Sequence, residues 1–150
     1  MSTSRGPRGG ADGPVAGERR RARERALGLL YEAEVKGIDP GKVLASLPAA
    51  PEPYAAELFL GVGRRSAELD ALVSAQSSSW AIGRMPAVDR QLLRLAAFEL
   101  AEHPEIPVAV VIDEAVELAK QYSTEDSSRF VNGVLAGLAA KLRPGEARPR

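Results

Sequence analysis

The clearest indication of the fold is the segment IPVAVVIDEAVELAKQYSTEDSSRFVNGVL, residues 106–135. Its apolar positions recur every three or four residues, at Val108, Val111, Ile112, Ala115, Ala119 and Tyr122. This spacing predicts one face of a helix of about four turns, and Pro107 suits the first turn. The β-branched start would also suit a strand, but the stripe continues unbroken through DEAVELAKQY, so its length favours a helix.

Other segments show the same helical spacing. Their apolar positions are Ala22, Ala26, Leu29, Leu30 and Ala33 in residues 18–37, then Val88, Leu92, Leu95 and Ala96, and finally Val131, Val134, Leu135, Leu138 and Leu142. Between them we expect a short helix bounded by Pro40 and Pro48, and one long helix from about Pro53 to Ala75. Residues 77–86 are expected to form a connector anchored by Trp80.

The chain shows no period-two alternation and no hairpin signal, so the fold class is all-α, a compact bundle of six or seven helices. Its 150 residues suit one domain. Residues 1–17 hold five glycines and two prolines and are expected to be a disordered tail. Residues 144–150 are expected to form a second tail, which leaves residues 18–143 as the folded part.

Composition excludes several kinds of site. There is no cysteine, which removes disulfides, thiolate zinc sites and cysteine nucleophiles. The single histidine, His103, is interpreted as a loop residue without a role. The carboxylates of Asp113, Glu114 and Glu117 are interpreted as a solvated helix face. We therefore expect no metal site, no cofactor and no enzymatic activity.

No apolar run approaches the roughly 20 residues of a membrane-spanning helix, and no secretory signal is present, so the expected location is cytoplasmic.

An arginine cluster at the start of the first helix is the strongest functional signal. Arg19, Arg20, Arg21, Arg23 and Arg25 lie within eight residues, although the partial positive charge of a helix N-terminus favours acidic residues there. The formal net charge of the chain is zero, so any attraction for a polyanion has to come from such a local cluster. Arginine forks match phosphate oxygens, which makes a nucleic acid the natural ligand.

The segment QYSTEDSSRF, residues 121–130, is the second signal. Ser123 and Asp126 resemble a capping pair at the start of the last helix. Phe130 follows close to this polar start, where it could pack inward or offer its ring to a nucleobase. Periodicity alone favours the core for Phe130.

Three stretches, RRRARERALGLLYEAEVKG (19–37), VDRQLLRLAAFEL (88–100) and residues 106–135, together resemble the NusB family of bacterial transcription antitermination factors. The resemblance covers roughly residues 19–140, and it departs from the family at the glycine-rich tail and at Gly28. It implies a bundle in two small subdomains. It also implies binding to the boxA segment of ribosomal RNA leader transcripts, jointly with the ribosomal protein NusE in the RNA polymerase antitermination complex.

The resemblance also assigns residues. The RNA-binding set it implies is Arg19, Arg20, Arg21, Arg23, Arg25, Tyr31, Asp126 and Phe130, so it moves Phe130 from the core to the RNA surface. Asp89, with Arg94 further along the same helix, is expected to face NusE. Monomer and homodimer both stay open, because a second copy could cover the surface that meets NusE. Two alternatives also remain, the RNA-binding module of a ribosomal RNA methyltransferase system and a helical protein-interaction domain.

Overall fold

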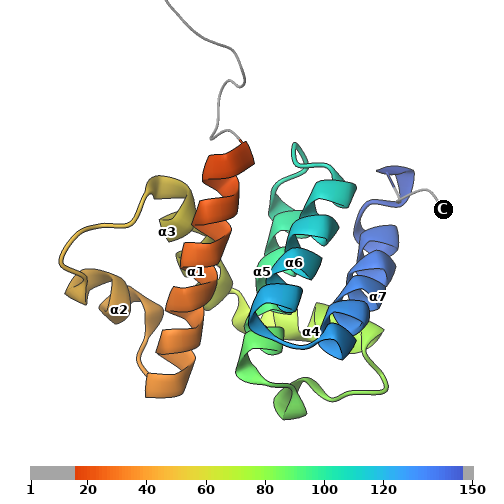
Figure 1. Ribbon diagram of the computed structural model, residues 1–150, viewed down its shortest axis with the longest axis horizontal. Coiled ribbons are helices and arrows are strands. Elements are labelled where there is room, and N and C mark those ends of the chain that lie inside the picture. The colour runs from red at the N-terminus through yellow and green to blue at the C-terminus, as the bar shows by residue number, and fades with distance from the viewer. Residues whose placement is uncertain (1–15, 147–150) are drawn as a thin grey trace, which may run out of the picture.

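The computed structural model describes residues 16–146, and within that range it contains seven α-helices, short 3₁₀ turns and no strand (Figure 1). The elements are α1 (Ala16–Lys36), α2 (Pro40–Ser46), α3 (Pro53–Arg64), α4 (Ser66–Gln76), η2 (Ile82–Arg84), α5 (Ala87–Glu102), α6 (Val108–Tyr122), α7 (Glu125–Leu142) and η3 (Pro144–Glu146). The all-α prediction is confirmed. Residues 1–15 and 147–150, which hold most of the two expected tails, lie outside the described residues.

The helices form two groups, with α1, α2 and α3 on one side and α4 to α7 on the other (Figure 1). Helix α5 joins the groups, because it contacts α1 and α3 as well as α4, α6 and α7. Its central position explains why Leu93, Ala97 and Leu100 are buried in addition to the stripe seen in the sequence. A helix covered from several sides needs apolar residues on most of its faces.

The long helix expected from Pro53 to Ala75 is broken in the structure. Helix α3 ends at Arg64 and α4 begins at Ser66. Arg65 between them has φ −114° and ψ 21°, and its N–H donates to the carbonyl oxygens of Gly61 and Val62. The apolar spacing continues across this break, so periodicity in the sequence did not reveal it.

The glycines of α3 permit close packing. A Cβ atom on Gly61 would lie 2.3 Å from the ring of Phe98, and one on Gly63 would lie 2.8 Å from Pro40. Both distances are shorter than van der Waals contact, so these two positions exclude larger residues.

The folded part also extends further than expected at its C-terminal end. Pro144–Glu146 was assigned to a tail, but the Glu146 carboxylate accepts the N–H of Val108 at 3.0 Å and so caps the start of α6. The buried guanidinium of Arg143 donates to four backbone carbonyl oxygens, those of Glu99, Leu100, His103 and Ile106. These contacts fasten the end of α7 to the α5–α6 connection.

A buried ion pair joins α1 to α5, and a tyrosine of α3 donates a hydrogen bond to it. Arg23 on α1 donates through Nε to both carboxylate oxygens of Glu99 on α5, at 2.8 and 3.0 Å. The hydroxyl of Tyr54 on α3 donates to the same carboxylate at 2.5 Å. Burial, reinforced by the negative charge of Glu99, raises the pKa of the Tyr54 phenol. The side chains of Arg23 and Glu99 are 3% and 1% exposed, so solvent does not screen their attraction.

Replacing Arg23 with Ala should destabilise the protein by about 3–5 kcal/mol, because the Glu99 carboxylate would stay buried without its counter-charge. Urea unfolding followed by circular dichroism measures this loss. Arg21→Ala is the matched control, since Arg21 is an exposed arginine on the same helix and its removal should change stability by less than about 0.5 kcal/mol. Equal effects of the two substitutions would contradict the role assigned to the buried pair.

A second polar cluster fastens the end of α1 to the start of α5. The Glu34 carboxylate pairs with Arg90 and accepts a hydrogen bond from Gln91 Nε2 at 2.6 Å. Arg90 also donates to the carbonyl oxygens of Ile82 and Met85 at 2.9 and 2.8 Å. Burial by itself would raise the pKa of Glu34, but the hydrogen bonds from Arg90 and Gln91 together lower it below its ordinary value of 4.5.

Because the folded-state pKa of Glu34 lies below the unfolded value, this carboxylate stabilises the fold above about pH 4.5, and that contribution is lost as the pH falls through the folded-state pKa. Glu34→Gln should therefore lower the free energy of unfolding by about 1 kcal/mol at neutral pH and by much less near pH 3. Urea titrations at both pH values test this. Glu32→Gln, which removes an exposed pair with Lys36, is the control and should have little effect at either pH.

Candidate nucleic-acid interface

The structure distributes the five arginines of α1 over different faces of the helix. Arg23 points inward to Glu99 and its side chain is 3% exposed, so its guanidinium does not reach the surface in this conformation, and its role as a phosphate contact stays a prediction. Arg19 is partly buried and its Nε is shielded from solvent. Arg20, Arg21 and Arg25 are exposed. An α-helix has 3.6 residues per turn, so these five arginines point in different directions around its axis although they are close in sequence.

Arg20 faces α6. Its guanidinium donates to both oxygens of Glu114, at 2.9 and 2.7 Å, while its side chain stays 65% exposed. This pair shows that the acidic face of α6 is not only solvated, as the sequence suggested, but in part neutralised by α1. An exposed arginine of this kind can exchange its carboxylate partner for a phosphate at small cost.

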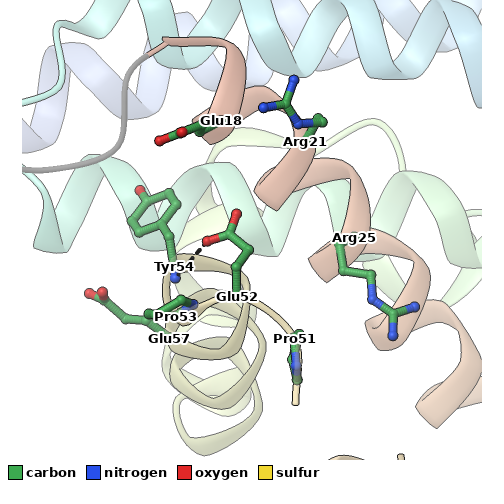
Figure 2. Close-up of a pocket in the computed structure, with 8 residues that line it drawn as sticks. All are labelled: Glu18, Arg21, Arg25, Pro51, Glu52, Pro53, Tyr54 and Glu57. Atoms are coloured by element: carbon green, nitrogen blue, oxygen red, sulfur yellow. Dashed lines mark hydrogen bonds between the residues drawn. The ribbon is translucent and has the colours of Figure 1, made fainter. Parts of the chain in front are cut away.

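Arg21 and Arg25 face the other way, toward the start of α3. They line an open groove of about 850 Å³ together with Glu18, Pro51, Glu52, Pro53, Tyr54 and Glu57 (Figure 2). The carboxylate of Glu52 occupies the N-cap of α3 and accepts the N–H of Tyr54 at 3.1 Å. Three carboxylates beside two guanidinium groups make the charge of this groove mixed, which weakens its attraction for a polyanion.

A smaller recess of about 270 Å³ lies between α1, α5 and α6. Its lining consists of Glu24, Leu27, Gly28, Tyr31, Val88 and Tyr122. Two aromatic rings border it, since Tyr31 is 43% exposed and Tyr122 is 46% exposed. No atom lies within 4 Å of the position that a Cβ on Gly28 would occupy, so the missing side chain leaves room in the recess.

Tyr122 is the functional candidate that sequence reasoning missed. The periodic stripe assigned it to the buried face of α6, but it is the last residue of that helix and lies exposed beside α1. Its hydroxyl donates to Glu24. The sequence offered one indication of this exposure. Tyr122 is the last apolar position in the helical spacing, and the last residue of a helix often extends beyond the core.

The start of α7 places Asp126 and Phe130 differently from each other. The Asp126 side chain is 88% exposed and pairs with Arg129. Phe130 is partly buried, with its ring 4.9 Å from that of Trp80 and at 71° to it. The helix is capped by Thr124, whose Oγ1 accepts the Ser127 N–H at 3.0 Å, and not by Ser123 as the sequence suggested.

The two residues expected to face a protein partner are both engaged within the fold. Asp89 is completely buried and accepts a hydrogen bond from the Ser127 hydroxyl at 2.7 Å, so it holds the first turn of α7 and offers no carboxylate at the surface. The interface role of Asp89 stays a prediction. Arg94 is 16% exposed and donates to both oxygens of Asp70 at 2.5 and 2.8 Å, and its interface role stays a prediction.

His103 has neighbours that the sequence did not indicate. Carboxylate oxygens of Glu57 and Glu105 lie 2.8 Å from its two ring nitrogens, and its ring meets that of Tyr54 edge to face. In residues 16–146 no three acidic or histidine side chains are arranged to hold a metal ion. None of the helices in that range is long and apolar enough to span a membrane.

Comparison with known proteins identifies the family. The model of the NusB family matches residues 20–140. The chain belongs to the NusB family. Transcription antitermination protein NusB of Acidothermus cellulolyticus is 44% identical over 135 residues, which cover 87% of this chain and 93% of the relative. The corresponding protein of Salinispora tropica is 46% identical over 128 residues, covering 81% of this chain and 94% of the relative.

Solved NusB structures share the fold. T. maritima NusB superimposes with a TM-score of 0.77 at 34% identity, covering 86% of this chain and 95% of that one. A crystal structure of the antitermination factors NusB and NusE in complex with double-stranded RNA gives a TM-score of 0.69 at 28% identity, covering 85% of this chain and 99% of that one. The named relatives are transcription antitermination proteins. The two-subdomain all-helical architecture is thus that of NusB.

The open space beside Gly28 leads to a prediction about the stability of a variant at this position. Gly28→Ala should stabilise this NusB protein by about 0.5–1 kcal/mol, because alanine favours a helix and its methyl group meets no atom within 4 Å. Gly61→Ala is the control in a second helix and should instead destabilise, since its Cβ would lie 2.3 Å from Phe98. Thermal unfolding of both variants measures the difference. A loss of stability in Gly28→Ala would show that the recess is closed in solution.

Proposed function

We propose that this chain is a transcription antitermination factor that binds a boxA-type segment of ribosomal RNA leader transcripts jointly with NusE. In this role it would keep RNA polymerase processive on ribosomal RNA operons, as part of an antitermination complex in the cytoplasm. The observation that carries the proposal is a set of candidate RNA contacts on three helices of a chain of the NusB family. This set, the α1–α6–α7 surface, comprises the exposed residues Arg20, Tyr31, Tyr122 and Asp126 and the partly buried Phe130.

The α1–α6–α7 surface suits unpaired RNA bases. Tyr31 and Tyr122 border a recess with an apolar floor at Leu27 and Val88, and stacking of a base on such rings contributes about 1–3 kcal/mol. Arg20 lies on the same side of α1 as this recess and can contact a backbone phosphate. Aromatic rings with a nearby guanidinium group form the usual combination for holding single-stranded RNA.

The charge balance explains why a partner protein is part of the proposal. The net charge is zero, and two of the five clustered arginines are buried or shielded. RNA affinity of the chain alone should therefore be modest, and a partner that contacts both the RNA and this protein would raise it by linkage. A solved complex holds NusB and NusE together with double-stranded RNA, which supports joint binding of RNA and NusE by a protein of this family. Arg94 is our candidate for the NusE contact, and a second copy of the chain is the competitor for that surface.

The mixed-charge groove at Arg21 and Arg25 favours a second candidate function, a protein-interaction domain. Two prolines and three carboxylates in its lining are better suited to a peptide than to a phosphate backbone. The two functions separate on whether a specific RNA is bound.

The test is fluorescence anisotropy of a labelled boxA-type RNA titrated with the full chain, with and without NusE, beside a scrambled RNA of equal length. We expect preference for boxA and tighter binding with NusE. Changing Arg20 to Gln should lower the salt slope of binding by about 0.7, the value for one phosphate contact to a single strand. Changing Arg21 and Arg25 to Gln as well should raise this decrease to about 2 only if the groove that they line also holds phosphate.

Arg64→Gln is the control, because Arg64 is an exposed arginine at the end of α3, on a different element from the α1–α6–α7 surface. It should leave the slope unchanged. Equal binding of boxA and scrambled RNA, or no RNA binding with NusE present, would overturn the proposed function in favour of the protein-interaction domain.

A further inference from the structure

Trp80 is the only tryptophan of the chain and is not part of the α1–α6–α7 surface. It lies in the connector between α4 and α5, partly buried against the hydrophobic core. Its ring centroid is 4.9 Å from that of Phe130, and the two rings meet edge to face at 71°. An edge-to-face pair is attractive because the positive edge of one ring contacts the negative face of the other.

The connector that carries Trp80 is itself fixed at both ends. On one side the Trp80 N–H donates to the Ser77 carbonyl oxygen at 3.1 Å, directly after the end of α4. On the other side Arg90 donates to the carbonyl oxygens of Ile82 and Met85. Because Arg90 also pairs with Glu34 on α1, the connector is held against the rest of the fold. Trp80 is therefore a firmly held partner for a neighbouring side chain.

Phe130 is also partly buried and packs against the hydrophobic core, but it lies beside a polar helix start. It is in the second turn of α7, four residues after the exposed Asp126. To stack on a base, the ring of Phe130 has to hold one orientation, and ordering a side chain on binding costs free energy. A ring already held in one orientation avoids that cost.

We propose that Trp80 is a positioning residue that holds the Phe130 ring for stacking on an RNA base. This inference rests on the proposed function, in which Phe130 contacts RNA, and adds a residue outside that set. Trp80 acts through Phe130 and does not have to touch the RNA. An aliphatic residue at position 80 would fill the space against the core but would lack the aromatic edge that orients Phe130.

The experiment compares Trp80→Phe with Trp80→Leu in the full chain, using labelled boxA-type single-stranded RNA with NusE present. Trp80→Leu should weaken RNA binding by about 3- to 10-fold, because the oriented aromatic pair is lost. Trp80→Phe keeps an aromatic ring and should bind within about 2-fold of the unchanged protein. Thermal unfolding of each variant is measured in parallel.

Ile82→Ala is the matched control for stability. Ile82 lies in the same connector and packs partly buried against the core, so its truncation removes core contacts but keeps the Trp80 ring and the hydrogen bond from Arg90 to the Ile82 carbonyl oxygen. It should lower the unfolding temperature while leaving RNA affinity unchanged. If affinity instead follows unfolding temperature across Trp80→Leu and Ile82→Ala, Trp80 is a structural anchor and the proposal is overturned.

A double-mutant cycle with Phe130→Ala distinguishes the positioning role of Trp80 from the RNA-binding function itself. If Trp80 acts through Phe130, Trp80→Leu should cause no further loss of affinity in the Phe130→Ala background. Additive losses would overturn the positioning role. Unchanged affinity in Phe130→Ala would also overturn it, but would leave RNA binding by the rest of the surface intact. Absence of RNA binding by the unchanged protein would overturn the proposed function itself.

Discussion

The carboxylate of Glu99 is buried in the last turn of α5, and the arrangement of α1, α3 and α5 depends on neutralising it there. Arg23 and Tyr54 both donate to this carboxylate, one from α1 and one from α3. A buried carboxylate without such partners would cost several kcal/mol, so the three helices can pack only in the register that brings these groups together. That register fixes which face of α1 points inward, and hence which arginines reach the surface.

Helix α1 carries different chemistry on each of its faces. Its inner face holds the alanine and leucine stripe and Arg23, while Arg20, Glu24 and Tyr31 look toward α6. Arg21 and Arg25 line the groove between α1 and the start of α3, together with carboxylates such as Glu52 and Glu57 (Figure 2). The five arginines therefore have different positions. Arg23 is buried, Arg19 is partly shielded, and the other three are exposed on two different sides of α1. Binding of a polyanion favours the side where aromatic rings accompany the charge, which is the α6 side.

The aromatic residues beside α6 and α7 lie on three different elements. Tyr31 belongs to α1, Tyr122 ends α6 and Phe130 lies in α7, where Trp80 of the connector supports it. Asp89 stabilises the same end of the molecule from inside, by accepting the hydrogen bond of Ser127 in the first turn of α7. The surface that the proposed function needs is thus assembled from helix ends, which a buried hydrogen bond and an aromatic pair keep in place.

The sequence by itself determined the helical class, most of the core stripes and the family, because each follows from spacing along one helix or from a contiguous motif. It could not show that the apolar stripe from Pro53 to Ala75 turns at Arg65, that Arg23 and Asp89 are buried, or that Tyr122 is exposed. Those outcomes depend on which helix lies opposite each side chain. Only the tertiary structure decided them, since Glu99 is 76 residues from Arg23 and Ser127 is 38 residues from Asp89.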